Sequence, residues 1–334
     1  MRNLLIFLFC ILFAHITRAQ VGHSVFGFLD FPFSSHANAL GGDNISIVGT
    51  DLSMVSHNPA LLGPEMSNQV SLKYMRYLKG VNLGGAQYAR AINNNGAWAI
   101  GAHYLDYGSF THTSEGNDVL GTFGAKDLCL DATIGYNISS KWRGGATAKF
   151  LYSAYESYTS LALAVDLGLN YYNPENTASF SVVVRNLGGQ LKKFDQIRES
   201  LPVDLQIGYS QHLAHAPFRF SVTAFNLLKW NTDVRNEAVD QNGNSTEKKS
   251  NFVKDLFRHI NLGVDYIYSD NFYAAIGYNY KRQSDFKSSG GFLTGFSLGL
   301  GVKIRMFDIH ASLASHHHSG TSLMFGTNLL LDKF

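Results

Sequence analysis

The residues that could carry chemistry in this sequence do not assemble into a catalytic set. Ser245-Thr246-Glu247-Lys248 and Ser269-Asp270-Asn271 match the S-x-x-K and S-D-N signatures of penicillin-binding enzymes, whose serine forms an acyl intermediate. The K-T-G motif that accompanies those signatures is missing from the chain. These matches therefore predict no acyl-transfer enzyme.

Histidine and cysteine offer the other possible sites. Imidazole is a common metal ligand, but the run His316–His318 has no carboxylate or cysteine close to it in the sequence. Cys129 has no assignable basic partner that would favour its thiolate, so we interpret it as a small buried thiol. We expect no catalytic residue, no cofactor and no metal centre.

The composition is that of an exported, folded chain. Hydrophobic residues occupy 45% of the 334 positions and charged residues 16%, with 17 Tyr and 24 Phe, whereas disordered chains have few aromatic and many charged residues. Arg2, an apolar run over residues 4–13 and a small-residue site ending at Ala19 predict a Sec signal peptide over residues 1–19. Arg2 and Arg18 leave with it, so 25 basic residues remain against 25 acidic residues, which argues against a nucleic-acid partner.

Beyond the leader, apolar and polar residues alternate along segments of about ten residues. Over Leu161–Tyr171 every second residue is large and apolar, and Ala, Asp, Gly or Asn stand between them. Side chains alternate between the two faces of a strand, so each segment has one apolar face. This pattern is typical of an outer-membrane barrel, but also of a soluble β-sandwich or jelly roll. The fourteen segments are 68–78, 81–92, 96–107, 121–138, 144–155, 160–172, 178–189, 202–213, 217–230, 259–269, 271–282, 292–306, 307–315 and 321–333.

The lengths of the connections favour the barrel. Every even-numbered connection is a tight turn, such as Asn93–Gly96, whereas Gly108–Leu120, Gln190–Leu201, Asn231–Arg258 and Gln283–Gly291 are longer and polar. Outer-membrane barrels have short periplasmic turns and longer external loops. We therefore predict an all-β protein, a 14-stranded antiparallel transmembrane barrel over residues 68–334, located in the outer membrane. The irregular segment 20–67 is predicted to be an N-terminal hatch that plugs it.

The external loops are the candidate binding elements, because loops on a rigid scaffold commonly carry function. Asn231–Arg258 is the longest of them, and tyrosines near the fifth and sixth strands add aromatic area of the kind enriched at interfaces. A solvated charged loop is the alternative interpretation. The candidate residues are Tyr155, Tyr158, Glu237, Asp240, Lys248, Lys249 and Lys254.

Several segments resemble a known family of barrels. Gly41, Gly42 and Asn58-Pro59-Ala60 are similar to the hatch of FadL-type fourteen-stranded barrels. A closer resemblance, over about residues 22–334, is to the PorQ family of the type IX secretion system. His36 departs from that family, in which an arginine is expected. The resemblance is carried by FLDFPFSS (28–35), ALGG (39–42), NPALL (58–62), YGSF (107–110), GTFGAKD (121–127), RNLGGQLKKF (185–194) and LPVDLQIGYSQHLAHAPFRFSV (201–222).

This resemblance implies a role that is not enzymatic. PorQ-like barrels belong to a surface attachment complex with the PorU sortase and the PorV barrel, and they anchor the surface protein PorZ. The complex attaches secreted cargo to anionic lipopolysaccharide in the outer membrane. The alternative is a FadL-like transporter of hydrophobic small molecules, in which glycine pairs such as Gly84-Gly85 and Gly144-Gly145 could kink a strand to open the wall. The mixed charges expected in the lumen disfavour a general porin.

Overall fold

The computed structural model describes residues 25–78, 80–114, 116, 118–195, 198–230, 252–285, 294–317 and 320–333. The predicted signal peptide, residues 1–19, lies outside the described residues. No helix in the described ranges is long and apolar enough to cross a bilayer.

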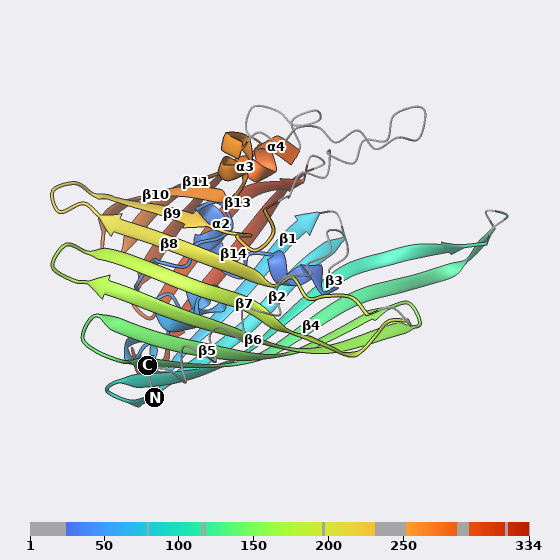
Figure 1. Ribbon diagram of the computed structural model, residues 1–334, viewed down its shortest axis with the longest axis horizontal. Helices are drawn as coiled ribbons and strands as arrows, with labels where there is room; N and C mark the ends of the chain where they lie inside the picture. Colours follow the sequence, from blue (N-terminus) through green and yellow to red (C-terminus); the bar gives the residue numbers. More distant parts are fainter. Residues whose placement is uncertain are drawn as a thin grey trace.

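Fourteen antiparallel strands form a closed barrel, which confirms the predicted fold class (Figure 1). Each strand pairs with the next along the chain, and the pairing of Gln69 with Leu330 joins the first strand to the last. The strands are β1 (Gln69–Leu78), β2 (Val81–Asn93), β3 (Gly96–Thr113), β4 (Val119–Asn137), β5 (Trp142–Tyr155), β6 (Tyr158–Asn173), β7 (Ala178–Lys192), β8 (Asp204–His212), β9 (Phe218–Ala224), β10 (Ile260–Ser269), β11 (Phe272–Asn279), β12 (Phe296–Ile304), β13 (Phe307–His317) and β14 (Gly320–Leu330).

The two rims of the barrel differ as the connection lengths predict. At the turn end, where β1 begins and β14 finishes, the strands are joined by short turns. At the opposite rim, the loop end, the longer connections carry α3 (Phe252–Arg258) and α4 (Tyr280–Asp285). Such barrels place short turns in the periplasm and long loops outside the cell, so we take the loop end as the external one. Apolar side chains of the strands cover the outer wall, among them Ile134, Leu167, Leu300 and Leu313.

The predicted loop Gly108–Leu120 is largely wrong, because most of it continues the strands. β3 runs on to Thr113 and β4 begins at Val119, and Phe110, Thr111, Thr122 and Phe123 are residue types with high strand propensity. A register shift between Asp106 and Ser109 accommodates Gly108, which has a positive φ. The pair therefore projects far beyond the rest of the rim (Figure 1).

The segment before β1 is a chain of short helical turns inside the barrel (Figure 1, blue). Their starts follow local capping chemistry, in which a polar side chain accepts a hydrogen bond from a free backbone N–H. Ser34 caps α2, Asp51 caps η2, and Asn58 caps η3 with a proline in the first turn. We call residues 25–67 the hatch. Its elements are η1 (Gly27–Asp30), α2 (Ser35–Ala39), η2 (Leu52–Ser56), η3 (Pro59–Leu61) and η4 (Pro64–Met66), and η6 (Leu331–Lys333) follows β14.

Candidate functional site

The hatch motif Asn58-Pro59-Ala60 is seated on the wall in the half of the lumen near the turn end. The Asn58 side-chain amide donates to the Ile45 carbonyl (2.7 Å) and to Ser181 Oγ of β7 (3.2 Å). Its Oδ1 accepts from the Ala60 backbone N–H (2.9 Å). All three motif residues are buried. The asparagine therefore fixes the hatch both to itself and to the barrel.

The wall beneath this motif is built of glycine. A Cβ added to Gly145 of β5 would lie 2.3 Å from the Pro59 carbonyl carbon and oxygen, and one added to Gly168 of β6 would lie 2.2 Å from Asn58 Oδ1. Gly145 therefore makes room for the hatch rather than kinking its strand. The same close approach to the hatch recurs at Gly135, Gly208, Gly263, Gly277 and Gly299.

The two other motif glycines of the hatch, Gly41 and Gly42, lie beside α2. Both have positive φ, a backbone conformation that favours glycine. The Gly41 carbonyl accepts from the Asn279 side-chain amide (3.1 Å), and a Cβ on Gly42 would lie 2.1 Å from Arg282 Nη2. These glycines let the hatch turn sharply beneath α4.

A buried ion-pair cluster joins α2 to the wall. Asp265 of β10 is fully buried, and its two oxygens meet His36 Nε2 (2.8 Å) and Arg219 Nε of β9 (2.8 Å). His36 stacks on Tyr273, with ring centroids 4.3 Å apart. His36 stands where the resemblance predicts an arginine, and it is held by the Asp265 carboxylate. The guanidinium in this cluster comes instead from Arg219 of the wall.

The upper lumen, toward the loop end, contains an apolar layer that sequence parity did not reveal. Alternation predicted polar and charged side chains facing inward, but the inward side chains of this layer are apolar, and Met75, Leu83, Leu105, Leu151 and Met324 are large. The hatch fills the space with Phe26, Phe28, Leu29 and Phe33. The cavity beside Leu29 and Phe33 is about 10 Å³, no larger than one water needs. On the wall the layer comprises Met75, Leu83, Leu105, Cys129, Leu151, Ala162, Ala164 and Met324.

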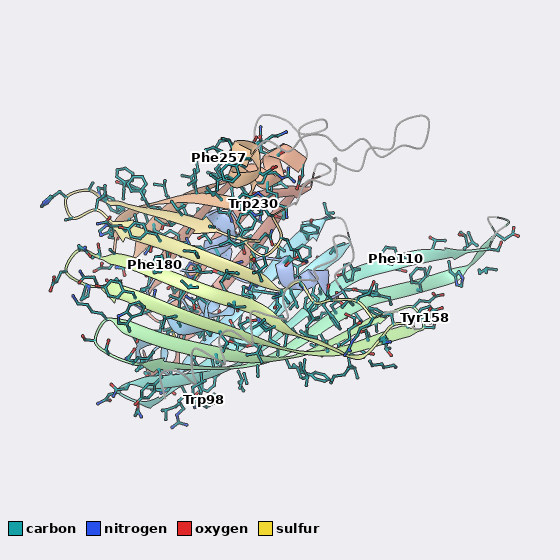
Figure 2. The ribbon with its side chains drawn as sticks, viewed as in Figure 1. Trp98, Phe110, Tyr158, Phe180, Trp230 and Phe257 are labelled. Atoms are coloured by element: carbon teal, nitrogen blue, oxygen red, sulfur yellow. The ribbon has the colours of Figure 1, made fainter. Side chains whose placement is uncertain are left out.

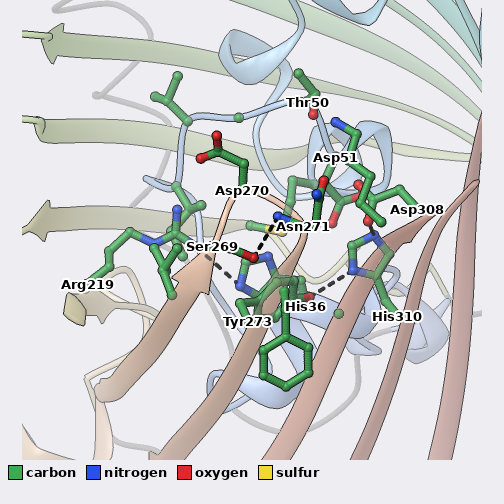
Figure 3. Close-up of a pocket in the computed structure, with 18 residues that line it drawn as sticks. His36, Thr50, Asp51, Arg219, Ser269, Asp270, Asn271, Tyr273, Asp308 and His310 are labelled. Atoms are coloured by element: carbon green, nitrogen blue, oxygen red, sulfur yellow. Dashed lines mark hydrogen bonds and ion pairs between the residues drawn. The ribbon is translucent and has the colours of Figure 1, made fainter. Parts of the chain in front are cut away.

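A polar pocket of about 200 Å³ opens at the turn end, between the hatch and the β10–β11 turn (Figure 3). Tyr273 Oη lies 2.8 Å from His310 Nδ1, and Asn328 donates to Asp51 Oδ1 (2.8 Å). Burial alone would raise the pKa of Asp51, but the nearby imidazoles of His310 and His36 and its hydrogen bonds hold that pKa below the usual value. Asp51 Oδ2 and Asn328 Oδ1 have no hydrogen-bond partner in the described structure, but the other contacts tie the hatch to the wall, and the arrangement resembles a structural network rather than a catalytic one.

In the described residues, the enzyme-like sequence motifs form no hydrogen bond to a second catalytic group. Ser245-Thr246-Glu247-Lys248 lies outside the described residues, and Ser269-Asp270-Asn271 forms the β10–β11 turn, where Ser269 Oγ accepts from the Asn271 N–H (3.3 Å). Cys129 is a free, buried thiol in the apolar layer. His316 and His317 end β13, and His318 lies outside the described residues. Within the described ranges no cluster of three or more His, Cys, Asp or Glu could hold a metal ion.

The candidate partner-binding residues are only partly described. Tyr155 and Tyr158 face each other across the tip of the β5–β6 hairpin, where Tyr158 is exposed and Tyr155 donates to Asp127 (3.0 Å). Lys254 lies exposed on α3, beside the exposed apolar side chains of Phe252 and Val253. Glu237, Asp240, Lys248 and Lys249 lie outside the described residues.

The most prominent external element is one that the sequence interpretation treated as a loop. We call residues 109–113 of β3 and 119–124 of β4 the ribbon. β3 last pairs with β2 at Asp106, and β4 first pairs with β5 at Ala125, so in the described residues the ribbon strands form ladder pairs only with each other. At the base of the ribbon, Gly124 accepts a backbone hydrogen bond from Glu156 (3.2 Å), and His112 lies 3.6 Å from the Glu156 carboxylate. Phe110 (labelled in Figure 2) stacks with Phe123 on the ribbon, and their ring centroids lie 5.4 Å apart. The signal available in the sequence was the high strand propensity of Phe110, Thr111, Thr122 and Phe123.

Comparison with known proteins gives matches by fold alone. No protein-family model matches the chain, and no curated protein matches it by sequence. The Pseudomonas putida toluene transporter TodX matches with a TM-score of 0.53 at 11% identity, covering 89% of this chain and 97% of that one. The CymD monoaromatic hydrocarbon channel matches with a TM-score of 0.51 at 12% identity, covering 91% and 97%.

The chain shares the barrel fold of TodX and CymD. This fold supports an outer-membrane location for the chain. Both matched structures are named for transport and neither for an enzyme activity. At this level of identity the likeness concerns the fold, and the site residues described above must carry any argument about function.

Proposed function

We propose that this chain is a closed, non-enzymatic anchor in the outer membrane, which holds a surface protein on its external rim. It would act as a PorQ-like barrel of the type IX secretion attachment complex, with a PorZ-like protein as the anchored partner and the PorU sortase and PorV barrel in the same assembly. The segments listed for that resemblance, from FLDFPFSS (28–35) to LPVDLQIGYSQHLAHAPFRFSV (201–222), support the family assignment.

The observation that carries the anchoring role is the ribbon. An unpaired strand edge presents free N–H and C=O groups to any other strand, and proteins usually protect such edges with lysine, proline or a covering loop. The ribbon contains no Lys, Arg, Asp, Glu or Pro, and Val119 and Leu120 at its start are among the most exposed apolar side chains. Within the described residues its protection is limited to the His112–Glu156 contact (3.6 Å) and a register shift between His112 and Thr113. An element of this kind, standing outside the membrane, is suited to docking a β-rich partner.

The filled lumen favours an anchor over a channel. A transporter of hydrophobic molecules needs an apolar cavity between hatch and wall. In the described part of this chain the apolar layer is occupied by the hatch's own phenylalanines, and the larger cavities between hatch and wall, of about 200 and 320 Å³, have several charged groups in their linings. A ligand of several carbon atoms would have to displace those side chains.

A transporter of hydrophobic small molecules is the second candidate. The fold comparison favours it, because TodX and CymD are named as a toluene transporter and a hydrocarbon channel. A shallow groove of about 390 Å³ also follows β6 and β7, where Leu163 and Val165 face Gly189 and Leu187 across a register irregularity. Such a groove could pass an apolar molecule sideways into the membrane.

Capture of partners from the native outer membrane separates the two functions. The intact barrel is purified in mild detergent, and its protein partners and bound lipids are identified by mass spectrometry. Recovery of a large surface protein with a sortase and a second barrel is expected for the anchor. A barrel recovered alone with a bound fatty acid or hydrocarbon would contradict anchoring and favour transport.

Two variants then locate the docking element. In one, residues 109–123 are replaced by a short turn, and in the other Asn231–Arg258 is replaced in the same way. We expect the ribbon variant to lose the surface protein while its barrel remains folded. If only the loop variant loses it, docking belongs to the loop that the sequence analysis selected.

A further inference from the structure

The external mouth of the barrel contains a pocket of about 320 Å³ that the anchoring role does not use. It lies between η1 of the hatch, the loop-end halves of β7 and β8, and α4. Its volume falls at the lower end of the range for small-molecule sites. Its lining differs from that of the apolar layer beneath, because buried polar groups and aromatic rings meet in it.

Three buried side chains on one wall of this pocket carry atoms without a partner. Asp204 Oδ2 accepts from the Gln206 amide (2.7 Å), but Asp204 Oδ1 and Gln206 Oε1 accept nothing in the described structure. Arg185 donates to Asp43 and to the Leu29 carbonyl through its terminal nitrogens, and its Nε has no acceptor. The three side chains are 7%, 2% and 4% exposed. These atoms offer free acceptors and a free donor, so the wall is suited to a ligand that both donates and accepts hydrogen bonds.

Cationic groups approach from α4. Arg282 lies against Gly42, and its Nη1 has no acceptor among the described residues. Burial lowers the pKa of Arg282 to about 10, so the guanidinium is charged at neutral pH. The lining also contains Asp30 and Asp43, and Asp43 lies near enough to Arg282 to act on its charge. Asp43 is paired with Arg185 (3.5 Å) and Asp285 with Arg258 (2.6 Å), so neither carboxylate is bound to Arg282 Nη1. With Lys281 also in the lining, the side of the pocket formed by α4 is the one that can accept an anionic group.

Aromatic rings form another part of the lining. Phe31 of the hatch and Tyr77 of β1 pack edge to face, with ring centroids 4.5 Å apart, and Phe225 lies at the end of β9. The C–H groups of a sugar ring pack against aromatic faces, and each sugar hydroxyl both donates and accepts. A hydrocarbon would leave the polar wall unsatisfied, whereas inorganic phosphate would leave the aromatic surface and the free acceptors unused.

We propose that this external pocket binds an acidic sugar, meaning a saccharide that carries a carboxylate or a phosphate. Its hydroxyls donate to Asp204 and Gln206, its acidic group accepts from Arg282, and its ring packs on the Phe31–Tyr77 pair. The sugar could come from solution or from the head group of a glycolipid in the outer leaflet. This site is independent of the proposed anchoring role, because it involves neither the ribbon nor a protein partner.

Calorimetric titration of the full-length barrel in detergent tests the proposal. The probes are glucuronic acid and glucose 1-phosphate, with glucose and inorganic phosphate as the neutral and sugar-free comparisons. We expect the acidic sugars to bind more tightly than either comparison. The variant Arg282→Gln should weaken the acidic sugars about tenfold or more and leave glucose unchanged. Gln206→Leu should weaken acidic and neutral sugars alike.

Controls make each outcome decisive. Lys126→Gln removes an exposed cation from β4, away from the pocket, and should have no effect, and unchanged heat-dependent gel mobility shows that each variant is folded. Absence of acidic-sugar binding, equal binding of inorganic phosphate, or insensitivity to both pocket variants would overturn the proposal. To distinguish the two sources, the barrel is titrated with free acidic sugar and, separately, with vesicles that contain an acidic glycolipid. Binding in either supports the site.

Discussion

The packing of the hatch against glycine predicts a large difference between two adjacent positions of β5. Gly145 faces the hatch, and a methyl group there would lie 2.3 Å from Pro59 backbone atoms and 2.6 Å from the Ala60 nitrogen. Gly144 faces the other way, and its added methyl group would meet only the flexible end of Ile138, at 3.1 Å. The substitutions Gly145→Ala and Gly144→Ala therefore form a matched pair.

The magnitude follows from what the hatch must give up. Backbone atoms at 2.3 Å must retreat by about 1 Å, and overpacking of this kind costs about 1–3 kcal/mol. Retreat of the motif also strains the three Asn58 hydrogen bonds, each of which contributes about 1 kcal/mol. We expect Gly145→Ala to lower the free energy of unfolding by roughly 2–5 kcal/mol and Gly144→Ala to leave it within about 0.5 kcal/mol.

Urea unfolding of both variants in the same detergent, followed by tryptophan fluorescence, measures this difference. Both changes replace a strand glycine by alanine, so any gain from reduced backbone freedom is shared and cancels in the comparison. Planar-bilayer conductance provides a second measurement, since displacement of the hatch should open a pore only in Gly145→Ala. Equal stability and equal conductance for the two variants would refute the proposed seating of the hatch.

Three further predictions concern charged and titrating groups. Asp265→Ala should destabilise the barrel by about 3 kcal/mol in urea unfolding, because it leaves the Arg219 guanidinium uncompensated; wild-type stability would exclude a bracing role. Glu65→Gln should cost only about 0.5–1 kcal/mol, and the cost should disappear at high salt, because the pair with Arg143 is partly exposed. Burial, with the nearby Arg185, holds the pKa of His57 well below 6.5. Unfolded chains therefore bind the proton first, so stability should fall as the pH drops below about 6.5, and His57→Gln should reduce that dependence.

The sequence was informative wherever the governing interaction was local. Residues alternate over Leu161–Tyr171 because successive side chains of one strand face the lipid outside and the lumen inside. This pattern predicted the strand count and the closure of the barrel correctly. The lengths of the connections depend on the same local segments. Both signals can be read without knowing which strands lie opposite each other.

Contacts between hatch and wall could not be predicted in this way. Asn58 meets Ser181 across 123 residues, and no local pattern indicates that Gly145 rather than Gly144 must lack a side chain. Alternation assigns each residue to a face of the barrel but carries no information about depth. For that reason it did not distinguish the apolar layer at Leu105 and Leu151 from the polar lumen below it.

The depth profile of the lumen bears directly on the choice between anchor and transporter. An apolar layer in the external half is what a pathway for hydrophobic molecules requires, and a filled layer is what a rigid plug requires. In this chain the apolar layer is filled from one segment, because Phe28, Leu29 and Phe33 all belong to the hatch. Transport would therefore have to begin with withdrawal of η1, while the motif at Asn58 stays seated on its glycines. An anchor needs no such movement, and the same packing gives it a stiff base for the ribbon.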